Sequence, residues 1–312
     1  MRKRLTSLVP SILSAIVVLV RPLPLKWTRK IGELVGGVFY YLLPRRKKIA
    51  LENLTIAFPD STDSWRRDRL RAGFHGWGRI VFELVALVAG KGDEIEKSIT
   101  IEGMEHLDAA LAAGKGVLIA GGHVGNFPVL GYVLKQRGHP FNFIIRMPEN
   151  ETMALWLNGI ITGLGLKLIP SSPRIECVRQ TVKSLRAGEL VLLQVDINAK
   201  RSTGIFVKFF DKWIPTFPGA AVFAQRTGAP LVPMFIVRDG PDRNKIVIQP
   251  PIFLPRIKNR DEQVYETIQQ LSTILEDFIR QHPDEWWWLH RRFRKAAKER
   301  PPRPEKLPMD SE

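Results

Sequence analysis

The chain has 312 residues, 45% of them hydrophobic, and a mean hydropathy of −0.07. A chain of this size and composition can bury a sizeable core, which excludes a disordered polyelectrolyte and a protein with many membrane spans. The single cysteine, Cys177, excludes an intramolecular disulfide framework.

The net charge of +16 is concentrated at the two ends of the chain. Residues 1–50 hold eleven Lys or Arg and one acid, Glu33, while the segment from Arg291 onward holds eight bases and four acids. A nucleic-acid groove would place its positive stripe across the folded body, so the pattern argues against a nucleic-acid partner. Basic ends beside Trp and long aliphatic residues favour an anionic membrane surface, by about 1 kcal/mol per cation. Solvated termini that aid solubility are the alternative.

Residues 5–20 form an apolar stretch behind the basic start. A helix of this length spans about 24 Å, against about 30 Å of membrane hydrocarbon. The chain continues Arg21-Pro22 without a small-residue cleavage site, which argues against a cleaved signal peptide. We expect either a short signal anchor or a helix lying in the membrane interface, and we favour the interface.

Helical patterns follow over residues 27–43 and from about 63 to 89, and beyond residue 100 short apolar runs alternate with helix-like stretches. The apolar runs cover 116–123, 141–146, 190–196, 230–237 and 245–251, and the helix-like stretches cover 126–137, 151–163, 174–187 and 217–227, before a last amphipathic helix at 262–280. This alternation predicts an α/β fold with a mixed central sheet flanked by helices.

The sequence thus predicts four parts. These are a membrane-associated helical region at 1–43, a helical segment at 44–99, an α/β domain at 100–294, and a basic, Pro-rich tail at 295–312 that we expect to be disordered.

The segment GVLIAGGHVGNFPVL, residues 116–130, is the strongest candidate for chemistry. A buried strand ends in two glycines, His123 follows, and Gly125-Asn126 lead into a helix, for which Asn126 suits the N-cap. Glycines at such a turn let the backbone approach a substrate and leave amides that stabilise negative charge. A histidine there, with an ordinary pKa of about 6.5, is positioned as a general base. A structural histidine at a turn is the alternative.

HVGNFP resembles the motif of the lipid A late acyltransferases, within the wider glycerolipid acyltransferase group. That motif sets a histidine four residues before an acid, usually as H-x-G-N-W-E. His123, Gly125 and Asn126 match it, and Phe127 stands at the aromatic position. Pro128 stands where the family has its acid.

Other segments are similar to the same family in the same order, and the resemblance covers about residues 27–294. They are RRKKIALENLTIAFPDST, GRIVFELVAL, FIIRMPEN, VLLQVDIN, GIFVKFFDKWIPTFPGAAVFAQRTGAPLVP and HPDEWWWLHRRF.

The resemblance implies acyl transfer from a thioester, commonly an acyl carrier protein, to a hydroxyl of a membrane glycolipid. It implies lipid A biosynthesis at the cytoplasmic face of the inner membrane. The sequence has no H-E-x-x-H, H-x-x-E-H or C-x-x-C pattern, so we expect no metal, and we expect no cofactor. His123 would act as the base, and Arg146, with amides near Gly122 or Gly125, would stabilise the oxyanion or bind phosphate. Asp196 corresponds to the family's aspartate.

Proline at position 128 cannot orient an imidazole. Either another carboxylate orients His123 from a different position, which we favour, or the imidazole works without one and the enzyme is slower. The candidates are Asp196, Glu149, Glu151 and Glu83, and Asp196 is favoured because it follows a predicted strand. Two alternatives stay open. The acceptor could be a lysophospholipid, an amino-acid lipid or a glycosylated inositol lipid, or the protein could be a catalytically silent lipid-binding relative.

An acyl channel is a further expectation, drawn from the Gly, Phe-Phe and Pro-Gly pattern after residue 203. Ordinary core packing explains its Phe residues equally well. The residues predicted to bind substrate are Gly122, Gly125, Asn126, Glu149, Gly204, Phe209, Phe210, Pro218 and Gly219.

Overall fold

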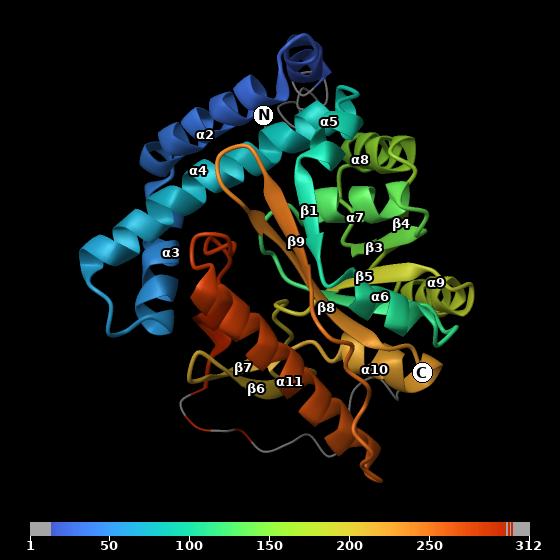
Figure 1. Ribbon diagram of the computed structural model, residues 1–312. Helices are drawn as coiled ribbons and strands as arrows, with labels where there is room; N and C mark the ends of the chain where they lie inside the picture. The colour runs from blue at the N-terminus through green and yellow to red at the C-terminus, as the bar shows by residue number, and fades with distance from the viewer. Residues whose placement is uncertain (1–13, 298, 300, 302–312) are drawn as a thin grey trace.

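A seven-stranded sheet forms the centre of the molecule in the computed structural model, which describes residues 14–297, 299 and 301 (Figure 1). The strand order is β1-β9-β8-β2-β5-β3-β4, and all neighbours run parallel except β8 and β9. The bounds are β1 (Ile99–Glu102), β2 (Val117–Gly121), β3 (Phe141–Ile145), β4 (Lys167–Pro170), β5 (Leu190–Gln194), β8 (Leu231–Arg238) and β9 (Asn244–Ile248). The predicted mixed sheet in an α/β fold is confirmed.

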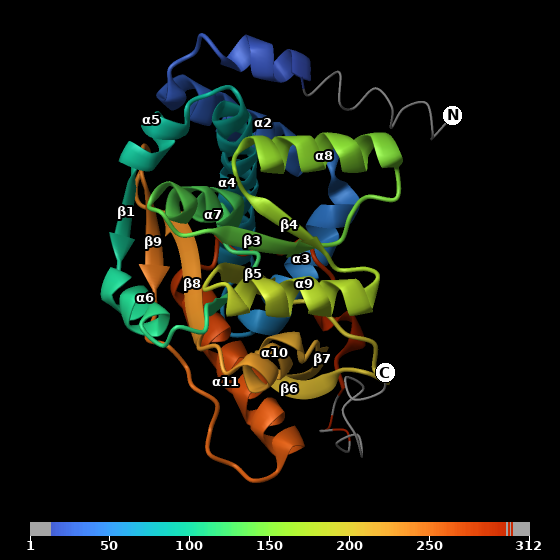
Figure 2. The ribbon, with the colours of Figure 1, turned by 90° about the vertical axis from the view of Figure 1, so that its right-hand side faces the viewer.

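Helices cover both faces of this sheet, as Figure 2 shows, so its central strands are apolar throughout. In β2, Leu118 and Ala120 belong to the core under α9, α10 and α11, while Val117 and Ile119 belong to the core under α6 and α7. The helices are α5 (Gly92–Lys97), α6 (Met104–Leu111), α7 (Phe127–Gln136), α8 (Glu151–Gly163), α9 (Arg174–Arg186), α10 (Gly219–Thr227), α11 (Arg260–Gln281) and the short 3₁₀ helix η1 (Arg292–Lys295).

Each of the five predicted apolar runs overlaps a strand, but the sequence interpretation missed β1, β4 and α6, which are short, and a separate hairpin. The hairpin pairs β6 (Ile205–Phe209) with β7 (Lys212–Thr216). Its two turn residues, Phe210 and Asp211, have φ angles of 47° and 56°. Asn and Gly are the usual residues in that conformation, so Phe-Asp gives no turn signal.

At the N-terminal side, α2 (Leu25–Leu42) lies along α4 (Asp63–Val88), with α3 (Pro44–Ala57) between them in sequence. A Cβ atom on Gly36 would lie 2.1 Å from the carbonyl oxygen of Phe74, and one on Gly78 would lie 2.1 Å from that of Gly32. The two helix backbones therefore touch at glycines, which fixes α2 against the α/β body.

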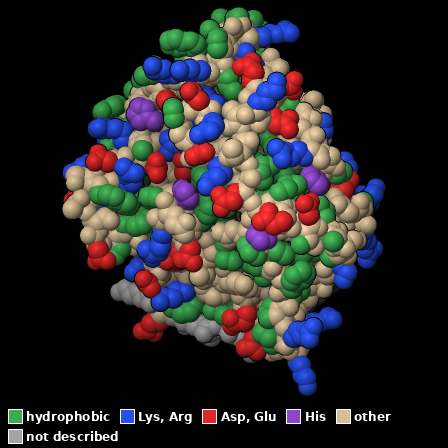
Figure 3. Space-filling view, viewed as in Figure 1, with side chains coloured by type: hydrophobic (Ala, Val, Ile, Leu, Met, Phe, Trp, Pro, Cys, Tyr) green, Lys and Arg blue, Asp and Glu red, His purple; other side chains and the backbone are tan. Residues whose placement is uncertain are grey.

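The outward side of α2 leaves large apolar side chains exposed, among them Leu34, Tyr41 and Leu42 at 63%, 67% and 64%. Figure 3 shows hydrophobic and basic side chains next to each other along the upper left edge of the molecule, where Figure 1 places α2. Residues 14–20 are helical, and the rest of the apolar stretch 5–20 and most of the 295–312 tail lie outside the described residues. Among the described helices, none has the length and apolarity needed to cross a bilayer.

Candidate active site

His123 lies on the loop that joins β2 to α7, and this loop is pressed against β8. Gly125 has a φ of 53°, and a Cβ atom there would lie 1.8 Å from the carbonyl oxygen of Ile236. Both the conformation and the space therefore require glycine.

Asp196, two residues beyond β5, holds the histidine. Its Oδ1 lies 2.9 Å from Nδ1 of His123, and its Oδ2 accepts the backbone N–H of His123 at 2.9 Å and Nε1–H of Trp286 at 2.8 Å. Because the ionised carboxylate accepts at Nδ1, that nitrogen carries the proton and Nε2 has its lone pair available. The carboxylate contact predicted for Asp196 is present, with Asp196 2% exposed and the His123 side chain 38% exposed.

His123 and Asp196 shift each other's pKa in opposite directions. The charge of Asp196 raises the pKa of His123 above its usual value, against the opposing effect of burial. Burial alone would raise the pKa of Asp196, but His123 and the N–H groups around the carboxylate bring it below its ordinary value. The carboxylate is thus ionised beside an imidazole of increased basicity, which suits a general base.

A segment near the C-terminus completes the loop. The amide of Gly125 donates to the carbonyl of Glu285 at 3.0 Å, and the amide of Trp287 donates to the carbonyl of His123 at 2.9 Å. The ring of His290 stacks on that of His123 with centroids 6.5 Å apart. The prediction of a free oxyanion-binding amide at Gly125 is therefore wrong, because Glu285 occupies that amide.

Asn126 is buried and anchors the loop through a side-chain hydrogen bond. It stands at the N-cap position of α7, but its side chain makes no cap and instead donates to Oε2 of Glu83 at 2.9 Å. Oε1 of Glu83 accepts from Nε of Arg29 at 2.7 Å and from Nε of Arg79 at 3.1 Å. Glu83 thus belongs to a buried cluster of ion pairs and hydrogen bonds, and it is not the carboxylate that contacts His123.

The two remaining candidate carboxylates are exposed and form no hydrogen bond with His123. Glu149 is 94% exposed and lies 3.7 Å from Arg146, itself 83% exposed. Glu151 is exposed in the first turn of α8. Gly122, in contrast, lies directly behind the histidine, where a Cβ atom would be 2.8 Å from Leu275.

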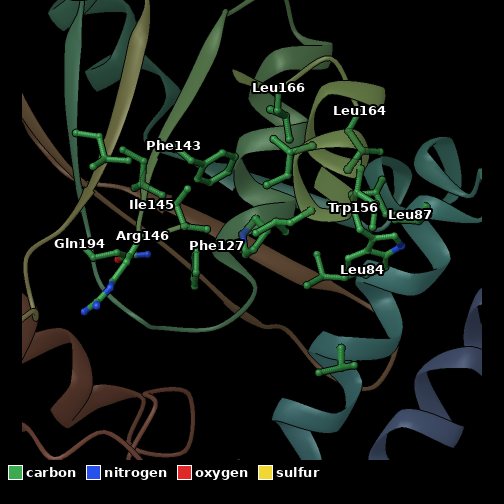
Figure 4. Close-up of a pocket in the computed structure, with 18 of the residues that line it drawn as sticks. Leu84, Leu87, Phe127, Phe143, Ile145, Arg146, Trp156, Leu164, Leu166 and Gln194 are labelled. Atoms are coloured by element: carbon green, nitrogen blue, oxygen red, sulfur yellow. The ribbon is translucent and has the colours of Figure 1, made fainter. Parts of the chain in front are cut away.

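An apolar cavity of about 560 Å³ opens beside His123, bounded by α4, α7, α8, β3 and β5. Figure 4 shows Gln194 and Arg146 at one end and Trp156, Leu84 and Leu87 at the other. Pro128 lines the cavity too, so the residue that replaces the family's acid adds apolar surface there.

The sequence interpretation missed this cavity, although α8 carried a signal. The helix ETMALWLNGIITG is rich in apolar residues, yet the structure buries none of them fully. Four of its apolar side chains line the cavity, namely Trp156, Leu157, Ile160 and Ile161.

The residues expected to form an acyl channel after position 203 do not line the cavity. Phe209 and Phe210 are buried in the core, with ring contacts to Trp286, Trp288 and Phe293. Gly204, Pro218 and Gly219 are buried around the same hairpin and the start of α10. The β6–β7 hairpin thus places this pattern in the core, away from the cavity.

Residues 2–295 match the bacterial lipid A biosynthesis acyltransferase family. This chain belongs to that family. A lipid A biosynthesis lauroyltransferase of Escherichia coli is 26% identical over 280 residues, which cover 88% of each chain. A lipid A biosynthesis palmitoleoyltransferase of the same organism is 23% identical over 265 residues, covering 85% of this chain and 84% of the relative. A phosphatidylinositol mannoside acyltransferase of Mycobacterium tuberculosis is 30% identical over 168 residues, 52% of each chain. As a member of this acyltransferase family, the protein is an enzyme that transfers acyl groups.

Proposed function

We propose that this protein moves a fatty acyl chain from an acyl thioester, carried by an acyl carrier protein, onto a hydroxyl of a membrane glycolipid in lipid A biosynthesis. The observation that carries the proposal is the His123–Asp196 pair beside a deep apolar cavity. The pair supplies a base, and the cavity supplies a site for a hydrocarbon chain.

In the proposed reaction, Nε2 of His123 takes the proton of the acceptor hydroxyl as its oxygen attacks the thioester carbonyl carbon. The tetrahedral intermediate collapses, the C–S bond breaks, and the imidazolium returns its proton to the leaving thiolate. Asp196 holds the tautomer and stabilises the imidazolium, which is the role of the carboxylate in a Ser-His-Asp triad. The contact supplies a carboxylate at His123 although Pro128 stands at the position of the family's acid, and it therefore favours an active enzyme over a catalytically silent relative.

Arg146 and Gln194 lie at the end of the cavity where the thioester carbonyl would sit (Figure 4). Both side-chain polar atoms of Gln194 are buried without a hydrogen-bond partner. We assign the oxyanion to donors from these two residues, since the Gly125 amide is occupied.

The cavity has the size and surface of an acyl site. Ligand pockets in proteins measure about 300–1,000 Å³, and each buried methylene contributes about 0.8 kcal/mol. An extended chain whose carboxyl carbon is near His123 would run toward Trp156 and Leu84.

The mycobacterial relative supports a second acceptor class, the glycosylated inositol lipids, because it is 30% identical over half of this chain. Purified protein should be given a radiolabelled acyl thioester and, separately, a glucosamine disaccharide lipid and a mannosylated inositol lipid. We expect label in the disaccharide lipid. Labelling of the inositol lipid alone would establish the second candidate, and labelling of neither would end the proposal.

We also propose that the protein works at the cytoplasmic face of the inner membrane, attached through the exposed apolar side of α2. Apolar burial is not screened by salt, so the full-length protein should sediment with vesicles in high salt. Leu34→Glu combined with Leu42→Glu should release it, whereas Ile175→Glu, on the 75% exposed Ile175 of α9, should not. Complete release of the unaltered protein by salt alone would contradict this attachment.

A further inference from the structure

A second hollow, of about 540 Å³, lies between α3 and the segment that follows the Trp run. Four cationic side chains line it, Arg45 and Lys48 from α3 and Arg291 and Arg294 from the C-terminal segment, against one acid, Glu52. We call this the basic hollow.

The four cations of the basic hollow have no side-chain hydrogen bond or ion pair within the described part of the chain. Two of their sequence neighbours, in contrast, have partners. Lys47 lies 4.5 Å from the centroid of the Tyr40 ring, and Arg292 donates to Asn198 and Thr216 at 2.8 Å each. Unpaired cations that converge on one concavity repel each other, and a bound anion would relieve that repulsion.

Asn53 and His290 link the basic hollow to the catalytic histidine. Asn53 forms part of its wall, is 4% exposed, and donates to the carbonyls of Trp288 and His290 at 2.7 Å each. The ring of His290 in turn stacks on that of His123. A ligand bound in the basic hollow would therefore contact the same chain segment that places His290 against His123.

We propose that the basic hollow binds a phosphate group of the acceptor lipid and thereby positions its hydroxyl at His123. This inference rests on the proposed function and assigns the acceptor's phosphate to the four cations of the basic hollow. Arginine pairs with phosphate through two parallel N–H···O bonds, and a concave cluster of cations fits a compact dianion.

Steady-state kinetics on the full-length protein test this. The acceptors are a glucosamine disaccharide lipid with phosphomonoesters and the same lipid after phosphatase treatment. The unaltered enzyme should have a KM lower by about 10- to 100-fold for the phosphorylated lipid, the scale of one or two charge-assisted hydrogen bonds. In the double variant Arg45→Gln/Arg294→Gln the two lipids should have similar KM values.

The matched control is Lys183→Gln, which removes one exposed cation from α9 and should keep the full discrimination. A thermal melt of each variant verifies that it is folded. If the double variant still discriminates between the two lipids, the proposal is wrong. It is equally wrong if only the KM for the acyl carrier protein rises, or if only binding to acceptor-free anionic vesicles weakens.

The failure of this inference can be separated from failure of the proposed function. Should the unaltered enzyme transfer acyl groups to neither lipid, titration calorimetry with the two lipids in neutral detergent micelles tests the basic hollow alone. Tighter binding of the phosphorylated lipid, lost in the double variant but kept in Lys183→Gln, supports the phosphate site. Equal binding of both lipids overturns it.

Discussion

Asp196 is 2% exposed and accepts three hydrogen bonds, whereas α8, which forms a wall of the adjoining cavity, has no buried residue. Both regions meet at His123. The polar region depends on individual donors and acceptors at fixed distances, so the loss of a single side-chain group there should lower turnover by orders of magnitude. The cavity would bind an acyl chain through its total apolar area. Substitutions that remove part of this area should therefore lower activity gradually and should change which acyl chain is preferred.

The largest expected effect is that of His123→Ala. Loss of a general base lowers turnover by about 10²–10⁴-fold. Because the imidazole is 38% exposed and Asp196 keeps its hydrogen bonds from the His123 amide and from Trp286, the melting temperature should change little. Turnover is measured with purified protein and an acyl thioester. Near-normal turnover in this variant would show that another group takes the proton.

Asp196→Asn should approach the same loss, because it removes the charge that stabilises the imidazolium. If the two residues act as one unit, the double variant Asp196→Asn/His123→Ala should be no slower than His123→Ala alone. Glu149→Gln serves as the control, since Glu149 is 94% exposed. Independent multiplication of the two losses would separate Asp196 from the catalytic step.

The pH profile sharpens the same point. His123 acts as a base only when neutral, so kcat/KM should fall as the pH drops through its pKa, which Asp196 raises above the usual value. In Asp196→Asn the attraction is gone, and the inflection should move to lower pH even as the maximum rate falls. An inflection at the same pH in both proteins would assign the titration to another group.

The smallest effect is expected in the cavity. Trp156→Ala enlarges the end away from Arg146 and should shift the preferred acyl chain toward longer homologues, by about fourfold in kcat/KM per methylene accommodated, given about 0.8 kcal/mol each. Leu155→Ala is the control, because Leu155 is 66% exposed on the same helix and does not line the cavity. Competing thioesters of different length provide the measurement. An identical shift in both variants would exclude a specific role for the cavity.

The sequence predicted what depends on local order. A strand, two glycines, a histidine and a helix start are consecutive in the chain, and Asp196 follows the next strand of the sheet, so their meeting could be expected. The hydrogen bond from Trp286 to Asp196 joins residues 90 apart, and that from Arg29 to Glu83 joins residues 54 apart. No periodicity encodes such pairs. The sequence did not predict the cavity either, because the residues that line it are spread along the chain from Val17 to Ile197.

The buried contact of Arg29 bears on how a shortened enzyme could be produced for crystallisation or assay. Leu25–Leu42 carries the exposed apolar surface that an experimenter would remove to keep the protein out of detergent. Arg29, 3% exposed, neutralises Glu83, 1% exposed, and also donates to Ser98 at 2.7 Å. Removal of Arg29 would leave Glu83 with Arg79 but would open a cluster of charges that is now buried, so the protein should lose stability. A truncated form therefore has to retain this helix. The exposed apolar side of the helix is better changed by point substitution than by deletion.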